Sequence, residues 1–299
     1  MINLEKIKSR TDYSDKLIWS KELADRVKKD FEPYAVIVGL TTGFDSNVAL
    51  KLATMFFNVT AAFTCDTTIA APETLDNCKK VAEDVYKLKY IRKAPPYAGK
   101  KENNETYFEV VKQHGFPGKT KTAHAWMYRW LKDHTVSSII SSIRQNKRNR
   151  PIIIISGARK HESVRRFGTS EDITIQGNNI WVNICNEWTN SEVHAFAMDN
   201  NLDKYRSPIS KSIGISGECF CGCFSTKGEL NEVKIASPST YEKIMNIYKW
   251  LKQNTNYDWD WESGPSKQFT MEKYGQINMF TKSNMIMCST CMNNTEVEI

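Results

Sequence analysis

The apolar segment AVIVGL at positions 35–40 restricts the fold of this chain more than any other feature. The run is continuous and lacks the alternation of a half-exposed strand, so it predicts a strand buried on both faces of a parallel sheet. A short turn of small and polar residues follows, and from Asp45 to Phe57 apolar residues recur at helical spacing. A buried strand followed by a turn and a helix is typical of an α/β fold.

The rest of the chain repeats this alternation. Further strands are predicted over 59–65, 89–92, 152–155 and 179–184, and helices over 72–85, 123–146 and 190–201. Thr189 and Glu192 have the spacing of a capping box at the start of the last of these helices. The stretch 93–121 is rich in Pro, Gly, Lys and Asn and is predicted to be a mobile insertion. We therefore expect a doubly wound, mostly parallel sheet, whose ligands lie at the carboxyl ends of its strands.

Composition restricts the location and the partners of the protein. No apolar run approaches the roughly 20 residues of a membrane span, and Met1–Arg10 lacks the apolar core of a signal peptide. We expect a cytoplasmic protein without membrane contact. The net charge of +7 allows an anionic partner such as a nucleotide or nucleic acid. The basic cluster at 144–150 favours a solvated helix end, where cations suit the negative end of the helix dipole, and a nucleic-acid surface is the alternative.

The turn after the first strand has the composition of a phosphate-binding loop. It reads Gly39-Leu40-Thr41-Thr42-Gly43-Phe44-Asp45-Ser46. Small residues at a strand-to-helix turn let backbone N–H groups approach a phosphate, and the helix N-terminus adds a positive dipole end. Because a carboxylate repels a bare phosphate, Asp45 indicates either a bound magnesium ion or a helix cap. A plain strand–helix turn without a ligand is the alternative interpretation.

A second candidate segment follows the strand at 152–155. It starts at Gly157 and contains Arg159, Lys160, His161, Glu162, Arg165 and Arg166. The carboxyl ends of parallel strands share one sheet edge, so this segment is expected beside the first loop. Arginine matches phosphate oxygens with paired hydrogen bonds. A surface helix carrying the same charges is the alternative.

Five of the eight cysteines form two tight groups near the C-terminus. The groups are Cys219-x-Cys221-x-Cys223 and Cys288-x-x-Cys291. Thiolates on short loops can meet at one metal, and two pairs supply the four ligands of zinc or an iron–sulfur cluster. The predicted ligands are Cys219, Cys221, Cys288 and Cys291, and Cys223 is left over. Buried free thiols are the alternative, as expected for Cys65, Cys78 and Cys185. The predicted domains are a nucleotide-binding domain over 1–204 and a cysteine-rich metal subdomain over 205–299.

Six motifs in this order resemble those of the phosphoadenosine phosphosulfate (PAPS) reductase family, within the adenine nucleotide α-hydrolase superfamily. Residues 41–46 are similar to the Ser-Gly-Gly-x-Asp-Ser pyrophosphate loop. Asp66-Thr67 with Pro72-Glu73-Thr74 is similar to the family's Asp-Thr and Pro-Glu-Thr. Segments 126–132, 157–166, 188–193 and 202–221 resemble its Leu-Lys segment, its arginine signature, its Trp-x-x-x-Glu-Val helix start and the approach to its cysteine centre. The likeness spans about 30–225.

The resemblance implies a nucleotide-binding enzyme with named site residues. The nucleotide would contact Leu40, Thr41, Thr42, Gly43, Asp45, Ser46, Asp66 and Gly157. Arg159, Glu162, Arg165 and Arg166 would be catalytic. Asp45-Ser46 stands here as in relatives that split ATP, and the Glu-Cys-Gly-x-His segment of the reductases is replaced by Glu218-Cys219-Phe220-Cys221-Gly222, with no histidine beyond His194.

The expected function is therefore ATP pyrophosphatase-type adenylation coupled to sulfur transfer, with ATP (or PAPS), Mg²⁺ and a [4Fe–4S] cluster or zinc as cofactors. Its partners would be an unidentified acceptor, which could be nucleic acid, and a protein that donates sulfur or electrons. The alternatives are a PAPS or adenylylsulfate reductase and a catalytically silent nucleic-acid-binding regulator.

Overall fold

The fold is built on one six-stranded sheet. The computed structural model describes residues 11–145, 150–162 and 164–265. The strands are β1 (Ala35–Gly39), β2 (Ala61–Cys65), β3 (Lys89–Lys93), β4 (Ile152–Ser156), β5 (Ile173–Gln176) and β6 (Asn179–Asn183). Their order is β3-β2-β1-β4-β6-β5, and every pairing is parallel except that of β5 with β6. The predicted doubly wound, mostly parallel sheet is confirmed.

The most apolar strands occupy the centre of the sheet. β1 lies between β2 and β4, with Ile37 opposite Ala61 on one side and Ile154 on the other. All residues of β1, β2 and β4 are buried, because helices cover both faces of the sheet. The sheet order places the ends of β1 and β4 side by side, and the two predicted site segments follow these ends.

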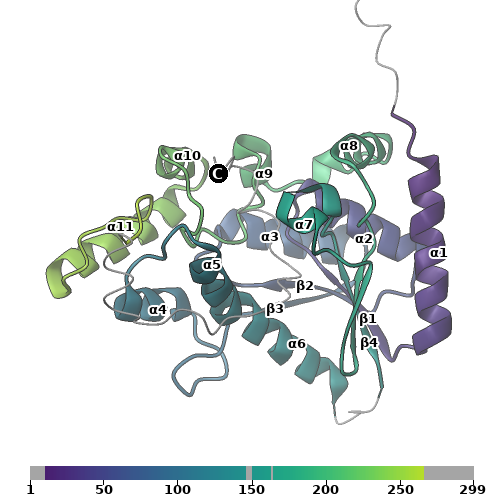
Figure 1. The fold of residues 1–299 in the computed structure, drawn as a ribbon, viewed down its shortest axis with the longest axis horizontal. Helices are drawn as coiled ribbons and strands as arrows, with labels where there is room; N and C mark the ends of the chain where they lie inside the picture. Colours follow the sequence, from purple (N-terminus) through teal and green to yellow (C-terminus); the bar gives the residue numbers. More distant parts are fainter. Residues whose placement is uncertain (1–10, 146–149, 163, 266–299) are drawn as a thin grey trace, which may run out of the picture.

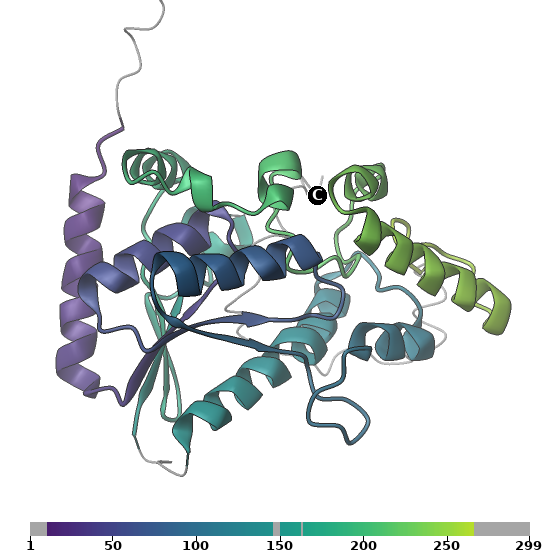
Figure 2. The ribbon, with the colours of Figure 1, turned by 180° about the vertical axis from the view of Figure 1, so that it is seen from behind.

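Helices cover the two faces of the sheet (Figures 1 and 2). One face packs against α1 (Ser14–Phe31), α2 (Phe44–Phe56), α3 (Pro72–Lys80) and α8 (Asn190–Asp199). The other face packs against α6 (His134–Arg144), through Val136, Ile139 and Ile140. The capping box predicted for Thr189 and Glu192 is present at the start of α8. No helix among the described residues is long and apolar enough to cross a bilayer.

Three local predictions needed correction. The stretch 93–121, predicted to be a mobile insertion, contains α4 (Thr106–His114), which buries Tyr107, Val110 and Val111 in the protein. The single helix predicted over 123–146 consists of α5 (Lys121–Tyr128), a π-helical turn η3 (Arg129–Asp133) and α6. A second π-helical turn, η2 (Val81–Val85), extends α3. Strand β5 was not predicted from the sequence. It lies at the edge of the sheet and is half exposed, so it lacks the apolar run that marks the inner strands.

The C-terminal elements build a second core beside the sheet. They are α9 (Pro208–Ile213), α10 (Glu229–Ala236) and α11 (Pro238–Asn254). The short η4 (Lys160–Glu162), α7 (Val164–Phe167) and η5 (Asp203–Tyr205) precede them, and Tyr205 of η5 packs against the first core. Ile244, Ile247 and Leu251 of α11 share this core with α4, α5 and the cysteine loop at 219–223. In Figure 1, α11 lies at the opposite end of the molecule from α1. The C-terminal half thereby places the cysteine loop near the strand ends.

Candidate nucleotide-binding site

The loop between β1 and α2 offers a row of backbone donors. Within the described residues, the N–H groups of residues 42–46 donate to no protein acceptor. The amides on either side do: Thr41 N donates to Ser46 Oγ at 3.3 Å, and Asn47 N donates to Gly43 O at 3.2 Å. The N-cap residue Gly43 has no side-chain capping bond. Unclaimed N–H groups at a helix N-terminus carry partial positive charge, and an anion is their preferred partner.

Side-chain hydroxyls hold this loop in shape. Thr41 donates to the Ser46 hydroxyl through both its N–H (3.3 Å) and its own hydroxyl (3.1 Å), and Ser46 donates to Gly43 O (3.3 Å). Thr42 has a φ of 53° and is fully buried. A β-branched residue with positive φ is strained, and such strain gathers at functional sites. The shape of the loop is therefore fixed by its own hydrogen bonds.

Asp45 does not cap the helix, because its carboxylate binds an arginine from the second predicted segment. Arg159 donates from Nε to Asp45 Oδ1 at 2.9 Å. Its other nitrogens donate to Trp188 O (3.1 Å) and to Asn190 Oδ1 (2.8 Å). The Arg159 side chain is only 5% exposed, and the nearby Asp45 charge and hydrogen bond raise its pKa despite burial. Arg159 thus links the loop at 41–46 to the start of α8 by hydrogen bonds.

Gly157 is placed at the closest approach of the two segments. A Cβ atom at this position would lie 2.7 Å from Asp45 O and 3.1 Å from Ser46 N. Any side chain would push the two backbones apart. The structure thus brings Gly157 and Arg159 against the loop, as expected from the resemblance.

Glu162 and Arg166 form a second buried pair one turn away. Arg166 Nε lies 3.1 Å from Glu162 Oε2, and both side chains are under 10% exposed. Burial raises the pKa of Glu162 to about 7, with the nearby Asp45 charge acting in the same direction and Arg166 opposing it. Arg165 belongs to α7, and its side chain lies outside the described residues. The predicted catalytic residues Arg159, Glu162 and Arg166 therefore gather beside Asp45.

Asp66 lies at the end of β2, away from this group. It accepts Arg92 Nε (2.9 Å) and Arg92 Nη2 (2.7 Å) on one oxygen and Thr68 N (2.9 Å) on the other. An open cleft of about 520 Å³ lies beside it, and its lining includes Pro72, Glu102 and Lys243. No residue of the 41–46 loop lines this cleft.

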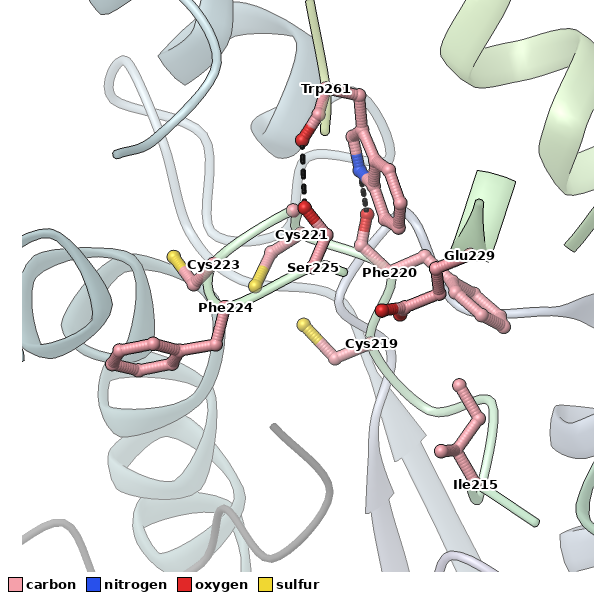
Figure 3. Close-up of a pocket in the computed structure, with 10 residues that line it drawn as sticks. Ile215, Cys219, Phe220, Cys221, Cys223, Phe224, Ser225, Glu229 and Trp261 are labelled. Carbon is pink, nitrogen blue, oxygen red and sulfur yellow. Dashed lines mark hydrogen bonds between the residues drawn. The ribbon is translucent and has the colours of Figure 1, made fainter. Parts of the chain in front are cut away.

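The cysteine loop lies over the second core. Cys219, Cys221 and Cys223 line one small cavity with Phe220, Glu229 and Trp261 (Figure 3). Of the three, Cys221 and Cys223 are buried and Cys219 is partly exposed. Among the described side chains no group of three or more His, Cys, Asp and Glu is arranged to hold a metal. Cys288 and Cys291 lie outside the described residues, so the four-ligand site stays a prediction. Cys65, Cys78 and Cys185 are fully buried.

One buried ion pair was not predicted from the sequence. Lys132 of η3 donates to Glu218 Oε2 at 2.8 Å, and both side chains are 3% exposed. Burying two charges costs desolvation free energy that can exceed their mutual attraction, so such pairs indicate a function or a specific geometry more than stability. Lys132 and Glu218 both fall in motif-like segments, but their 86-residue separation hides the contact from sequence reasoning.

Taken together, the parallel sheet and the loop of free N–H groups at its edge define a nucleotide-binding α/β protein. The model of the phosphoadenosine phosphosulfate reductase domain matches residues 35–206, more than half of the chain. The chain belongs to this family, and the resemblance noted from its motifs is confirmed.

Solved structures similar to this chain are distant. A phosphoadenylyl-sulfate (PAPS) reductase from Candida auris, in a phosphate complex, is 18% identical, with 61% of this chain and 79% of that chain covered and a TM-score of 0.42. An NH3-dependent NAD synthetase from Campylobacter jejuni, in complex with nitrate, is 17% identical, with 84% and 100% covered and a TM-score of 0.42. No curated protein matches the chain.

Proposed function

We propose that this protein binds ATP at residues 41–46, adenylates an acceptor and couples that step to sulfur transfer. The proposal rests on the N–H groups from Thr42 to Ser46, which donate to no acceptor within the described chain. Such donors match the oxygens of a pyrophosphate group, and the helix N-terminus favours its charge. Family membership supports a nucleotide as the ligand.

Asp45 is the reason for preferring ATP with magnesium. One of its oxygens is fixed by Arg159, and no bond to the other is found among the described residues. A fixed, partly exposed carboxylate fits Mg²⁺, which binds through one or two carboxylates together with phosphate oxygens. The ion would neutralise charge on the β- and γ-phosphates. Arg159 would act through Asp45, because its own nitrogens are engaged.

The proposed step balances without an oxidant. An acceptor oxygen attacks the α-phosphorus of ATP, the bond from that phosphorus to the bridging oxygen breaks, and pyrophosphate leaves with the electron pair. Residues 42–46 would hold the pyrophosphate that leaves. Arg166 and the other basic residues of segment 157–166 would lie near the negative charge that develops as the α-phosphate is attacked. A hydrosulfide delivered by a donor protein would then attack the activated carbon of the acceptor, the carbon–oxygen bond to the adenylate would break, and AMP would leave with that oxygen and its electron pair.

The cysteine centre would serve the second step. Cys219 and Cys221 would supply two thiolate ligands, with Cys288 and Cys291 as the other two. A [4Fe–4S] cluster would supply sulfur or electron chemistry, whereas zinc would only hold the loop. Cys219 and Cys221 line one cavity and would supply soft donors, which either centre prefers.

The family's name favours one rival, a reductase that releases sulfite from PAPS or adenylylsulfate. Purified protein should be assayed with ATP for pyrophosphate and with PAPS and adenylylsulfate for sulfite, each with a candidate RNA or DNA acceptor present and absent. Pyrophosphate release that requires Asp45 supports the proposal. Sulfite release supports the reductase instead. Binding of oligonucleotides without either product would indicate a silent regulator and overturn both.

A further inference from the structure

Three successive backbone carbonyls just before Cys219 are bound by the loop that follows β2 and by the first turn of α3. Thr74 Oγ1 donates to Ser216 O at 2.8 Å, Ala71 N donates to Gly217 O at 2.8 Å, and Thr67 Oγ1 donates to Glu218 O at 2.7 Å. Both threonines are fully buried. Cys219 is therefore held at a fixed place on the sheet edge by groups more than 140 residues earlier in the chain.

The segment Ser207–Glu218, here called the bridging segment, also contacts the nucleotide loop. Ser207 N donates to Thr42 O at 3.1 Å. Ser216 Cβ lies 3.6 Å from the place of a Cβ atom on Gly43. One segment thus begins and ends on the loop at 41–46 and leads directly into the cysteine loop.

Gly217 allows the bridging segment to pack closely against Thr74. Its φ is +72°, and an added Cβ would lie 2.7 Å from Thr74 Oγ1 and 2.9 Å from Ile209 Cγ2. Only glycine fits both the left-handed backbone and the space. The contact of the bridging segment with Thr74 is therefore specific, and a shift of either partner must move the other.

We propose that Thr67 and Thr74 are positioning residues that hold Cys219 at the nucleotide loop, so that a ligand on residues 41–46 restrains the cysteine loop through the bridging segment. The coupling rests on the proposed function only for the identity of that ligand. A phosphate bound by the N–H groups of Thr42 and Gly43 fixes the peptide whose carbonyl accepts from Ser207. The restraint then passes along the bridging segment to Glu218 and Cys219.

The hydroxyl groups of Thr67 and Thr74 are the groups that would position Cys219. Replacing Thr67 or Thr74 by valine keeps the shape of the side chain and removes the hydroxyl that donates to Glu218 O or to Ser216 O. Ser216 O keeps only a longer bond from Ser207 Oγ, at 3.4 Å, among its hydroxyl donors. Loss of such a bond makes local opening easier, and opening is what amide hydrogen exchange measures. We expect about tenfold faster exchange in the peptide 216–221 for each valine variant.

The test is hydrogen–deuterium exchange of the full chain, as purified, with and without Mg·ATP. In the wild type, Mg·ATP should slow exchange in 216–221. Thr67→Val and Thr74→Val should raise the ligand-free rate and reduce or abolish the effect of Mg·ATP, while Thr67→Ser and Thr74→Ser retain it. The matched control is Thr135→Val, a fully buried threonine of α6 whose hydroxyl donates to Leu131 O, one turn earlier in η3, at 3.0 Å. It should leave 216–221 unchanged.

The outcomes separate the two proposals. Unchanged ligand-free exchange in both valine variants would overturn the positioning role, whatever ligand the protein binds. Thermal stabilisation by Mg·ATP without any change of exchange in 216–221 would overturn the coupling and leave the nucleotide site standing. If Mg·ATP, PAPS and pyrophosphate all fail to stabilise the protein, the proposed function fails, and the ligand-free comparison still decides the roles of Thr67 and Thr74.

Discussion

The carbonyl oxygen of Asp45 lies 2.7 Å from the place that a Cβ atom on Gly157 would occupy. Two backbones therefore touch where the loops after β1 and β4 meet. This approach brings Arg159, two residues beyond Gly157, within 2.9 Å of the Asp45 carboxylate. The geometry of the loop at 41–46 therefore depends on the absence of a side chain at position 157, in the loop after β4.

Gly157→Ala should therefore disturb the site more than the fold. We expect a loss of about 1–3 kcal/mol in the free energy of unfolding, as for overpacking in a core. Turnover and ATP affinity should fall as well, because the loop at 41–46 moves. Urea unfolding and isothermal titration with Mg·ATP measure the two effects. Gly168→Ala is the control, since nothing lies within 4 Å of a Cβ atom there.

Mg·ATP should stabilise the wild-type protein, by about 2.7 kcal/mol at a ligand concentration of one hundred times Kd. Asp45→Ala should remove this stabilisation because the carboxylate for the metal is lost. Gly43→Val should remove it because bulk blocks the approach of phosphate. Gly43→Ala should keep it, since an added Cβ meets only ordinary contacts at 3.6 and 3.9 Å. Equal thermal shifts in all four proteins would exclude the loop as the nucleotide site.

Arg159→Ala should cost stability as well as turnover. The substitution leaves Asp45, Trp188 O and Asn190 without their donor, and breaking a buried pair costs about 3–5 kcal/mol. Partial exposure of Asp45 places the expected loss at the lower end. Arg159→Lys should recover part of the stability and little of the activity, because one ammonium cannot reach three acceptors. Wild-type turnover in Arg159→Ala would show that the arginine has no part in the reaction.

The Glu162→Gln variant should gain stability relative to the wild type as the pH rises from about 5 to about 7. Burial raises the pKa of Glu162 to about 7 in the folded protein. In this range the unfolded chain loses the proton and the folded protein keeps it, so the carboxyl makes folding less favourable with rising pH. Glutamine does not titrate. Chemical unfolding of both proteins across this range is the measurement, and a constant difference would contradict the raised pKa.

Anaerobically purified protein should be brown if the cysteine centre holds an iron–sulfur cluster and colourless with bound zinc otherwise. Replacing Cys219, Cys221, Cys288 or Cys291 by serine should lower the metal content sharply. Cys65→Ser and Cys78→Ser are the controls, because burial raises the pKa of both thiols and keeps them protonated. If Cys223→Ser empties the centre and Cys219→Ser does not, the choice of ligands is wrong.

Much of the scaffold could be predicted because its signals are local. Continuous apolar runs such as Ala35–Gly39 and Ile152–Ser156 cannot be exposed, and they gave the inner strands almost to the residue. The capping box at Thr189 is likewise a short-range pattern. Helix α4 was missed because the polar and glycine-rich residues around it obscure its buried side chains, which pack against the distant helix α11.

The sequence by itself determined that strands and helices alternate and that small, hydroxyl-bearing residues follow the first strand, since periodicity and turn chemistry act between neighbours. The tertiary structure decided which side chains meet. It engaged Arg159 with Asp45, Trp188 and Asn190, it paired Lys132 with Glu218, and it placed Thr67 and Thr74 under the segment that leads to Cys219. These contacts join residues from 29 to 151 positions apart, and burial and close packing, which act in space and not along the chain, select them.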